Sequence, residues 1–519
     1  MQILCNPICF REEENMKKIF GKLALLCVML TVLTGTLSGC NSVEKEPENV
    51  IYITSTWGQG MSEENTSYVN DYLKAAGCDY MIKYITFGTA VEPGSADDYC
   101  TEVMNYAKEN PVDIFLASAG PNSMDKVAYD IFIENDLLEP LDEYLESDKG
   151  RELYSCIPVA RWESIRRNGH IYGVSGDYFE ACTSPAVIFS KKLLEKYGYS
   201  EADVNCGIGE LSSIVRTISE GEADNPEYTA ISMKSWLMDQ WPSLYMPNPY
   251  MDYVGINDEG RAECIFSNEE YRSFLKDVFG LAEESGVKVT VGGEPEFEDC
   301  LMTVSCWALP WFNPVCMFEY TLTGYKASKT RLPEYIITYP YGMSIDIVRP
   351  CAINNCVMKQ SRNKERAYDF LTRVYTDKKL SEIVLYGREN VTYEIHDGLI
   401  YTRDDDKVRG ASPSRAFFLG NSYISPPGSS EIPDKDAVIS KYADKIQYGK
   451  YYSYFYKIAG KVDLCSKISQ LGEGFLSRAA AAEDFDGFYD DFLLELNEAG
   501  LSELLDDIQN DFDEWSKKQ

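Results

Sequence analysis

The sequence predicts an α/β protein in which helices flank mainly parallel sheets. Apolar, β-branched runs at 50–55, 81–87 and 112–117 read as strands, and the segments between them, 62–76 and 97–108, have helical periodicity. Strands that alternate with helices at this spacing predict βαβ units. Ligands of such sheets bind beyond the carboxyl ends of the strands, so the loops after the first and third strands are candidate walls of a site.

Length and charge limit the classes of function. At roughly 150 residues per domain, 519 residues correspond to two to four domains. The chain has 83 acidic and 49 basic residues, for a net charge of −34, which repels phosphate backbones and excludes nucleic acid as a partner. Its 2 histidines leave little room for histidine triads or multi-histidine metal sites.

The N-terminal segment predicts export. Met16-Lys17-Lys18 is basic, residues 23–37 are uncharged, and Leu37-Ser38-Gly39-Cys40 follows. This order is typical of a signal peptide that ends in a bacterial lipobox. We expect residues 1–39 to be removed and Cys40 to be lipidated, with residues 40–49 as a polar tether. Because acidic residues precede the basic region, we expect translation to start at Met16.

The cysteines after Cys40 do not predict a disulfide scaffold. Their spacing shows no framework, and several, such as Cys264 and Cys306, lie in apolar surroundings where a thiol acts as a small hydrophobe. We expect mostly reduced thiols.

Further elements follow from local patterns along the rest of the chain. Asn168-Gly169 is a hairpin-type turn. Ser267 and Glu270 form a capping-box pattern. The expected helices are 128–135, 191–197, 271–285, 364–375 and a C-terminal set within 488–515, and the expected strands are 170–174, 185–190 and 299–305, with a turn at 258–260.

Four segments in order resemble one known family. They are Asp113-Ile-Phe-Leu, Asn135-Asp-Leu-Leu-Glu-Pro-Leu-Asp142, Asn168-Gly-His-Ile-Tyr-Gly-Val174 and Ala186-Val-Ile-Phe-Ser-Lys-Lys-Leu-Leu194. Together with the lipobox, they resemble family 1 extracellular solute-binding proteins, the sugar-capturing lipoproteins of ABC importers. The C-terminal helices resemble the large Firmicute branch linked to oligosaccharides, so the resemblance covers nearly all of residues 40–519.

The resemblance implies a two-lobed periplasmic-binding-protein type II fold with hinge strands between the lobes. Lobe one would contain residues 50–180 and 307–375, and lobe two residues 181–306 and 376–519. A carbohydrate would bind in the cleft between the lobes, and permease subunits of the importer would read the closed form. The resemblance further implies a monomer that is lipid-anchored on the extracellular face of the membrane and needs no cofactor.

Candidate ligand-binding residues are chosen because sugars stack on flat aromatic rings and pair with planar polar groups. The set is Trp57, Gln59, Ser118, Asp177, Tyr178, Phe179, Trp236, Trp241, Trp307 and Trp311. Each tryptophan has core packing as its alternative role, and the 177–179 segment has hinge packing. Weaker candidates are Glu180, Asp239, Gln240, Asn421 and Tyr423, whereas Trp162 and Trp515 are interpreted as packing residues.

Rival chemistries find less support. A glycosidase needs two carboxylates about 5–10 Å apart in a cleft, and no signature selects such a pair, so no catalytic residue is predicted. The acidic run around Asp484-x-Asp486-Gly487 lacks the spacing of a calcium loop, and Cys351-x4-Cys356 has poor zinc spacing, so no metal is predicted. A carbohydrate-active enzyme and a receptor for another solute, such as a peptide, remain the alternatives.

Overall fold

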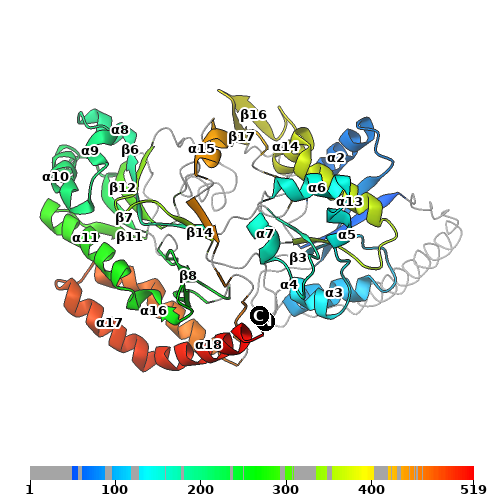
Figure 1. The fold of residues 1–519 in the computed structure, drawn as a ribbon. Coiled ribbons are helices and arrows are strands. Elements are labelled where there is room, and N and C mark those ends of the chain that lie inside the picture. Colours follow the sequence, from blue (N-terminus) through cyan, green and yellow to red (C-terminus); the bar gives the residue numbers. More distant parts are fainter. Residues whose placement is uncertain are drawn as a thin grey trace, which may run out of the picture. The chain divides into compact units, whose positions relative to one another are not determined.

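The computed structural model of the chain is shown in Figure 1. It divides into Met1–Val50, of which only the last two residues are described, and Ile51–Gln519, and each unit is considered by itself. The described residues are 49–56, 61–87, 96–117, 128–157, 159–176, 181–233, 238–248, 251–292, 299–306, 308, 335–347, 354–402, 419–421, 424–428, 434–442, 445–448, 450–451, 454–458 and 460–518. The expected signal peptide and Cys40 lie outside them.

The first sheet contains the strands that the N-terminal pattern predicts. Its order is β2 (Met81–Phe87), β1 (Val50–Thr56), β3 (Ile114–Ala117), β15 (Asn354–Val357) and β4 (Val174–Ser175). β1 and β3 are parallel, whereas β15 runs antiparallel to both β3 and β4. The sheet is therefore mixed and not mainly parallel, because β15 enters from a distant part of the chain.

Helices near the first sheet arise from amphipathic segments. In α2, Ser62 caps the N-terminus by accepting a hydrogen bond from the Asn65 backbone, and Val69 and Leu73 are buried. The helices of this part are α2 (Glu63–Ala75), α3 (Ala96–Tyr106), α4 (Ala128–Glu134), α5 (Asp142–Leu145), α6 (Asp148–Cys156), α7 (Val159–Ser164), α13 (Lys364–Thr376) and α14 (Lys378–Tyr386). The expected helices 62–76, 97–108, 128–135 and 364–375 are confirmed.

The second sheet is also mixed. Its order is β11 (Val289–Val291), β7 (Thr229–Met233), β12 (Cys300–Ser305), β6 (Ala186–Ser190) and β13 (Tyr335–Thr338). β7 is parallel to β11 and β12, and β6 is antiparallel to β12 and β13. The expected strands 185–190 and 299–305 are confirmed.

Figure 1 shows helices gathered around the second sheet. These helices are α8 (Lys191–Lys196), α9 (Glu201–Val204), η1 (Ile208–Leu211), α10 (Ser212–Gly221), η3 (Ile265–Ser267), α11 (Glu269–Ser285), α16 (Val462–Ala479), α17 (Phe485–Ala499) and α18 (Leu501–Ser516). One small sheet has the order β10 (Ala262–Cys264), β9 (Val254–Asn257), β8 (Leu244–Tyr245). The hairpin of β16 (Tyr393–His396) and β17 (Leu399–Thr402) lies beside α14, where Tyr393 donates a hydrogen bond to Glu382, and α15 (Lys435–Tyr442) is a separate helix.

Two paired strands lie on the connections between the large sheets. The chain runs from β4 through β5 (Ala181–Thr183) to β6, and later from β13 through β14 (Ile345–Ile347) to β15. β5 and β14 are antiparallel partners, and β18 (Ile446–Tyr448) adds to β14 in parallel. We call β5 and β14 the crossing strands; they occupy the place in the chain that hinge strands require.

Local expectations failed at two points. Helix α11 begins at Glu269, and its N-cap is Asn268, whose side chain accepts hydrogen bonds from the backbones of Glu270 and Tyr271. The predicted capping box is wrong because Asn268 caps equally well and lies one residue later. The expected strand 170–174 is reduced to β4 and an isolated bridge between Arg167 and His170.

Strand pairing and packing also differ from the expected division into lobes. β13 belongs to the second sheet, although residues 307–375 were expected in lobe one. Residues of α14 such as Leu380 and Ile383 pack in the core of the first sheet, although residues 376–519 were expected in lobe two. β13 and α14 thus differ from the expected division, and the remaining boundaries between the lobes stay a prediction.

Each large sheet has its own hydrophobic core. The first includes Trp162, which is fully buried and stacks on Tyr154 with ring centroids 5.4 Å apart. In the second, Trp515 packs against Tyr454 and Phe512 at the C-terminus. Both tryptophans are packing residues, as predicted.

Buried thiols in the second core act as apolar side chains. Cys264 and Cys306 are fully buried, and burial raises the pKa of Cys264 to about 12, so its thiol stays protonated at neutral pH. In the described part of the chain, no helix is both long and apolar enough to cross a membrane.

Candidate ligand-binding site

Most of the predicted site residues lie outside the described part of the chain. Trp241 is described, whereas the others stay predictions: Trp57, Gln59, Ser118, Asp177, Tyr178, Phe179, Trp236, Trp307 and Trp311. The site is therefore built from the described residues around the strand ends, the crossing strands and Trp241.

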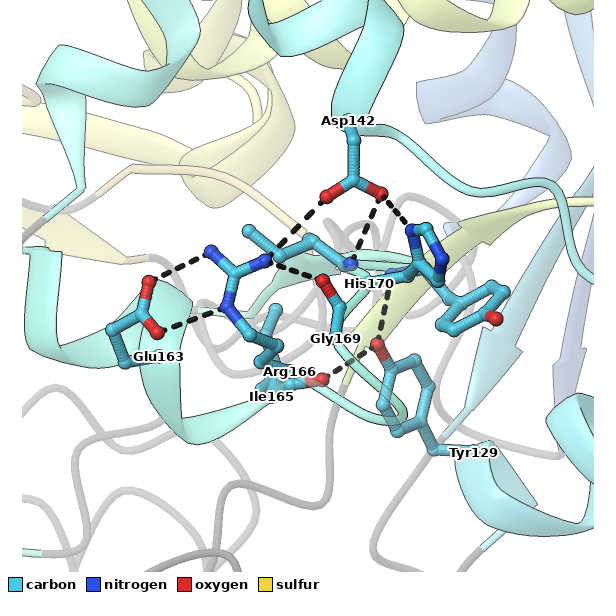
Figure 2. Close-up of polar contacts among 9 residues, drawn as sticks. Tyr129, Asp142, Glu163, Ile165, Arg166, Gly169 and His170 are labelled. Atoms are coloured by element: carbon cyan, nitrogen blue, oxygen red, sulfur yellow. Dashed lines mark hydrogen bonds and ion pairs between the residues drawn. The ribbon is translucent and has the colours of Figure 1, made fainter.

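One carboxylate joins two of the sequence motifs (Figure 2). Asp142 is the first residue of α5. Its Oδ2 accepts a hydrogen bond from the backbone N–H of Ile171 at 3.4 Å and lies 3.1 Å from Nδ1 of His170. Its Oδ1 lies 3.5 Å from Arg166, which also donates to the carbonyl oxygen of Gly169 at 3.0 Å. The Pro-Leu-Asp segment thus anchors the Asn-Gly turn.

Two further contacts fix the backbone between this turn and β4. The Tyr129 hydroxyl donates to the carbonyl of Ile165 at 2.9 Å and accepts from the backbone of Tyr172 at 3.0 Å, as Figure 2 shows in part. Gly173 packs so closely on β15 that a Cβ there would lie 2.8 Å from Sγ of Cys356. These contacts set the path of the chain toward the first crossing strand.

Polar groups collect at the carboxyl edge of the first sheet, where a site is expected. β1 and β3 end at Thr56 and Ala117, directly before the predicted site loops. Next to Ala117 and Ser175 in the sheet register, Asn354 is fully buried, and within the described residues neither its Oδ1 nor its Nδ2 has a hydrogen-bond partner. A buried amide without a partner costs about 1–3 kcal/mol, so a polar atom supplied by a ligand would stabilise it.

A short hydrogen-bonded chain spans the crossing strands. Ser184, just after β5, and Ser344, just before β14, have hydroxyl oxygens 2.8 Å apart, and Ser344 Oγ donates to Asp346 at 3.1 Å. Burial is the main cause that raises the pKa of Asp346 to about 6, and the nearby charge of Asp258 adds to the effect.

A cavity of about 680 Å³ opens beside these serines. We call it the Trp241 cavity. Its lining residues are Ser184, Pro185, Trp241, Pro242, Ser243, Leu244, Asn257, Asp258, Glu259, Arg261, Glu263, Asn268, Glu270, Tyr341, Gly342, Met343 and Ser344. Its size lies within the range of ligand pockets, about 300–1,000 Å³.

Trp241 forms one rigid wall of this cavity. The residue is only 5% exposed, and its ring packs edge-on against Tyr271, with ring centroids 5.1 Å apart and planes at 90°. It also contacts Phe274 of α11. Trp241 therefore packs in the second core and also lines the cavity, whereas its contact with a sugar stays a prediction.

A network of amides and a carboxylate lies on another wall. Glu263 of β10 accepts a hydrogen bond from the side-chain amide of Asn257 at 2.7 Å and one from that of Asn268 at 3.4 Å. Sequence reasoning missed this trio, because the β9–β10 turn carried no signal beyond its Asp258-Glu-Gly260 pattern. Carboxylates and amides of this kind recognise hydroxyl groups.

The acidic run near α17 is engaged in ion pairs. Arg272 lies 3.3 Å from Asp486 and 2.8 Å from Asp490. Among the described residues, no group of three or more His, Cys, Asp or Glu side chains could hold a metal ion.

The mixed sheets and the crossing strands define the class of fold: it is the two-lobed α/β fold of extracellular solute-binding proteins. In particular, the chain is similar to the N-glycan transport solute binding protein from Streptococcus pneumoniae, with a TM-score of 0.60, 16% identity and coverage of 91% of this chain and 99% of that chain. The same protein in complex with Man1GlcNAc gives a TM-score of 0.53 at 16% identity, with coverage of 91% and 100%.

A further solved structure is an extracellular solute-binding protein from Bifidobacterium longum subsp. infantis, with a TM-score of 0.51, 13% identity and coverage of 90% of this chain and 99% of that chain. No family model matches the sequence, and no curated protein matches it. At these identities, the similarity establishes the fold.

Proposed function

We propose that the chain is a lipid-anchored extracellular receptor that captures a carbohydrate, in particular an oligosaccharide, and delivers it to an ABC importer. It performs no chemistry on the sugar. The Trp241 cavity is the observation that carries this proposal, because it offers an aromatic wall together with side-chain amides and carboxylates beside the crossing strands. Sugars need both kinds of surface.

Similar proteins of known structure support a carbohydrate ligand. One similar protein is named for N-glycan transport and was solved with Man1GlcNAc. Another, from Bifidobacterium longum infantis, is named as an HMO-binding, ABC-transporter-associated protein, with a TM-score of 0.50 and 13% identity. The permease partners, the anchor at Cys40 and the monomeric state follow from the sequence resemblance and are part of the proposal.

Calorimetric titration of the purified mature chain with a panel of neutral oligosaccharides tests the proposal, with the sugar recovered and analysed by chromatography. Saturable binding with the sugar intact is expected. Hydrolysed sugar would favour a carbohydrate-active enzyme, and binding of peptides but no glycan would favour a receptor for another solute.

The predicted aromatic contact provides a site-directed test. Trp57→Ala is expected to weaken sugar binding by about 1–3 kcal/mol, the scale of a lost aromatic anchor. Trp515→Ala is the control, because Trp515 packs at the C-terminal helix. Unchanged affinity in a folded Trp57→Ala variant would remove Trp57 from the site.

A labelling experiment tests the anchor separately. Cells that express the full chain are fed a fatty acid with an alkyne tag, and incorporation into the protein is measured. Cys40→Ala is expected to abolish labelling and to release the chain from the membrane fraction. Equal labelling of the two chains would contradict lipidation at Cys40.

A further inference from the structure

We propose that the Trp241 cavity selects uncharged carbohydrates and rejects anionic ones, such as glycans that carry uronic or sialic acids. This inference rests on the proposed function, because it names the chemical class of the ligand for the same site. It follows from the charges on the cavity wall and from what already neutralises them.

Carboxylates dominate the charged lining of the cavity. Four of its lining residues are acidic, Asp258, Glu259, Glu263 and Glu270, and its one cationic lining residue is Arg261. The guanidinium of Arg261 lies 3.6 Å from Glu259, so its charge is already paired. No lining cation is left for a carboxylate of the ligand, among the residues that the structure describes.

One further cation contacts the backbone of a lining residue. Lys450 donates a hydrogen bond to the backbone carbonyl oxygen of Asp258 at 3.1 Å. It reduces the negative potential on that side of the cavity, but it faces a carbonyl and is not one of the lining residues. The field of Asp258 still reaches the crossing strand, where it contributes to the raised pKa of Asp346.

Glu263 contributes most directly to the expected preference for neutral over anionic sugars. Its two described partners, Asn257 and Asn268, are neutral amides, so they orient the carboxylate without cancelling its charge. A sugar hydroxyl can donate to such a carboxylate. A carboxylate on the ligand can only accept, and it would be brought next to like charges in a partly desolvated wall, which costs binding free energy.

Matched sugar pairs test the inference by calorimetry on the mature chain. Galactotetraose is compared with tetragalacturonate, and lactose with 3′-sialyllactose, alongside the neutral panel used for the proposed function. We expect every anionic member to bind at least about tenfold more weakly than its neutral partner at low salt, because like charges oppose binding. The ratio is expected to shrink as salt rises, since salt screens exposed charges.

Isosteric charge removal links the effect to the cavity. Glu263→Gln removes the negative charge and keeps the shape of the side chain. The ratio of the affinity for the neutral sugar to the affinity for its anionic partner is therefore expected to fall by about threefold or more. Glu270→Gln, on the exposed start of α11, is a second variant for the case that Glu263→Gln does not fold. Glu503→Gln on the exposed face of α18 is the matched control and is expected to leave the ratio unchanged.

The outcomes separate this inference from the proposed function. Anionic sugars that bind as tightly as their neutral partners would overturn the inference and leave a carbohydrate receptor standing. A neutral-to-anionic affinity ratio that stays the same in both Glu263→Gln and Glu270→Gln would also overturn it. Failure of every glycan in the panel to bind the folded chain would overturn the proposed function, and the inference would fall with it.

Discussion

Asp346 on crossing strand β14 is expected to destabilise the folded chain at neutral pH. The residue is 7% exposed and pairs in register with Cys182 of β5, and its carboxylate accepts a hydrogen bond from Ser344. Burial is the main cause that raises its pKa from the ordinary value of 3.8 to about 6, and the charge of Asp258 adds to it. The folded state therefore holds the proton more tightly than the unfolded state does.

The size of the effect follows from the pKa difference. Between pH 3.8 and about 6 the folded chain binds more protons at this site than the unfolded chain, so stability falls as the pH rises through this window. Each pKa unit corresponds to about 1.4 kcal/mol, so the full cost above pH 6 is about 3 kcal/mol. Below the unfolded pKa, the carboxyl is protonated in both states and the cost vanishes.

Asp346→Asn removes the titration while it keeps the shape of the side chain. We expect the free energy of unfolding to rise by about 1–3 kcal/mol at pH 7.5 and to change little at pH 3.5. Urea unfolding followed by tryptophan fluorescence at the two pH values measures this, with Asp506→Asn on the exposed face of α18 as the control. An Asp346→Asn chain that is equally or less stable at pH 7.5 would refute the reasoning.

Three further substitutions test contacts of the first sheet, each by urea unfolding. Asp142→Ala is expected to lower the free energy of unfolding by about 1–2 kcal/mol, because it removes charged contacts to the Asn-Gly turn. Asp148→Ala is the control and should lower it little, because the Asp148 side chain is 97% exposed. Gly173→Ala is expected to lower the free energy of unfolding by about 1–3 kcal/mol, because the added methyl group overpacks against β15. A second substitution in the same chain, Cys356→Ala, should recover part of this loss, because it removes the Sγ atom that the methyl group would meet. Asn354→Leu is expected to stabilise the free chain by about 1–2 kcal/mol, because it removes a buried amide that has no hydrogen-bond partner among the described residues, and to weaken sugar binding in calorimetry.

The sequence predicted the elements whose signal is local and periodic. β1, β2 and α13 match their expected ranges because their apolar residues repeat with the period of the element that they form. The resemblance implied hinge strands, but the ranges of β5 and β14 were not predicted. β5 and β14 are three residues long, and each is defined by pairing with a partner more than a hundred residues away, which no local pattern records.

The candidate site was harder to predict for the same reason. Trp241 was selected because aromatic rings bind sugars; it lies on the cavity wall, and its contact with a sugar stays a prediction. Glu263, Asn257 and Asn268 were missed, since these three ordinary polar residues come together on the cavity wall only when the β9–β10 hairpin meets the N-terminus of α11. Among 83 acidic residues, nothing local distinguishes Glu263 from the rest.

The position of the cavity bears on how binding could be coupled to movement. A ligand shifts a conformational equilibrium only if it interacts differently with the two states. Ser184 and Ser344 line the cavity, and they also tie the ends of the two crossing strands to each other and to Asp346. A sugar hydroxyl that competes for either serine would change the hydrogen bonds of the crossing pair itself. The free energy of sugar binding can therefore act directly on β5 and β14, the segments that connect the two large sheets. A solute receptor needs binding to act at these connections.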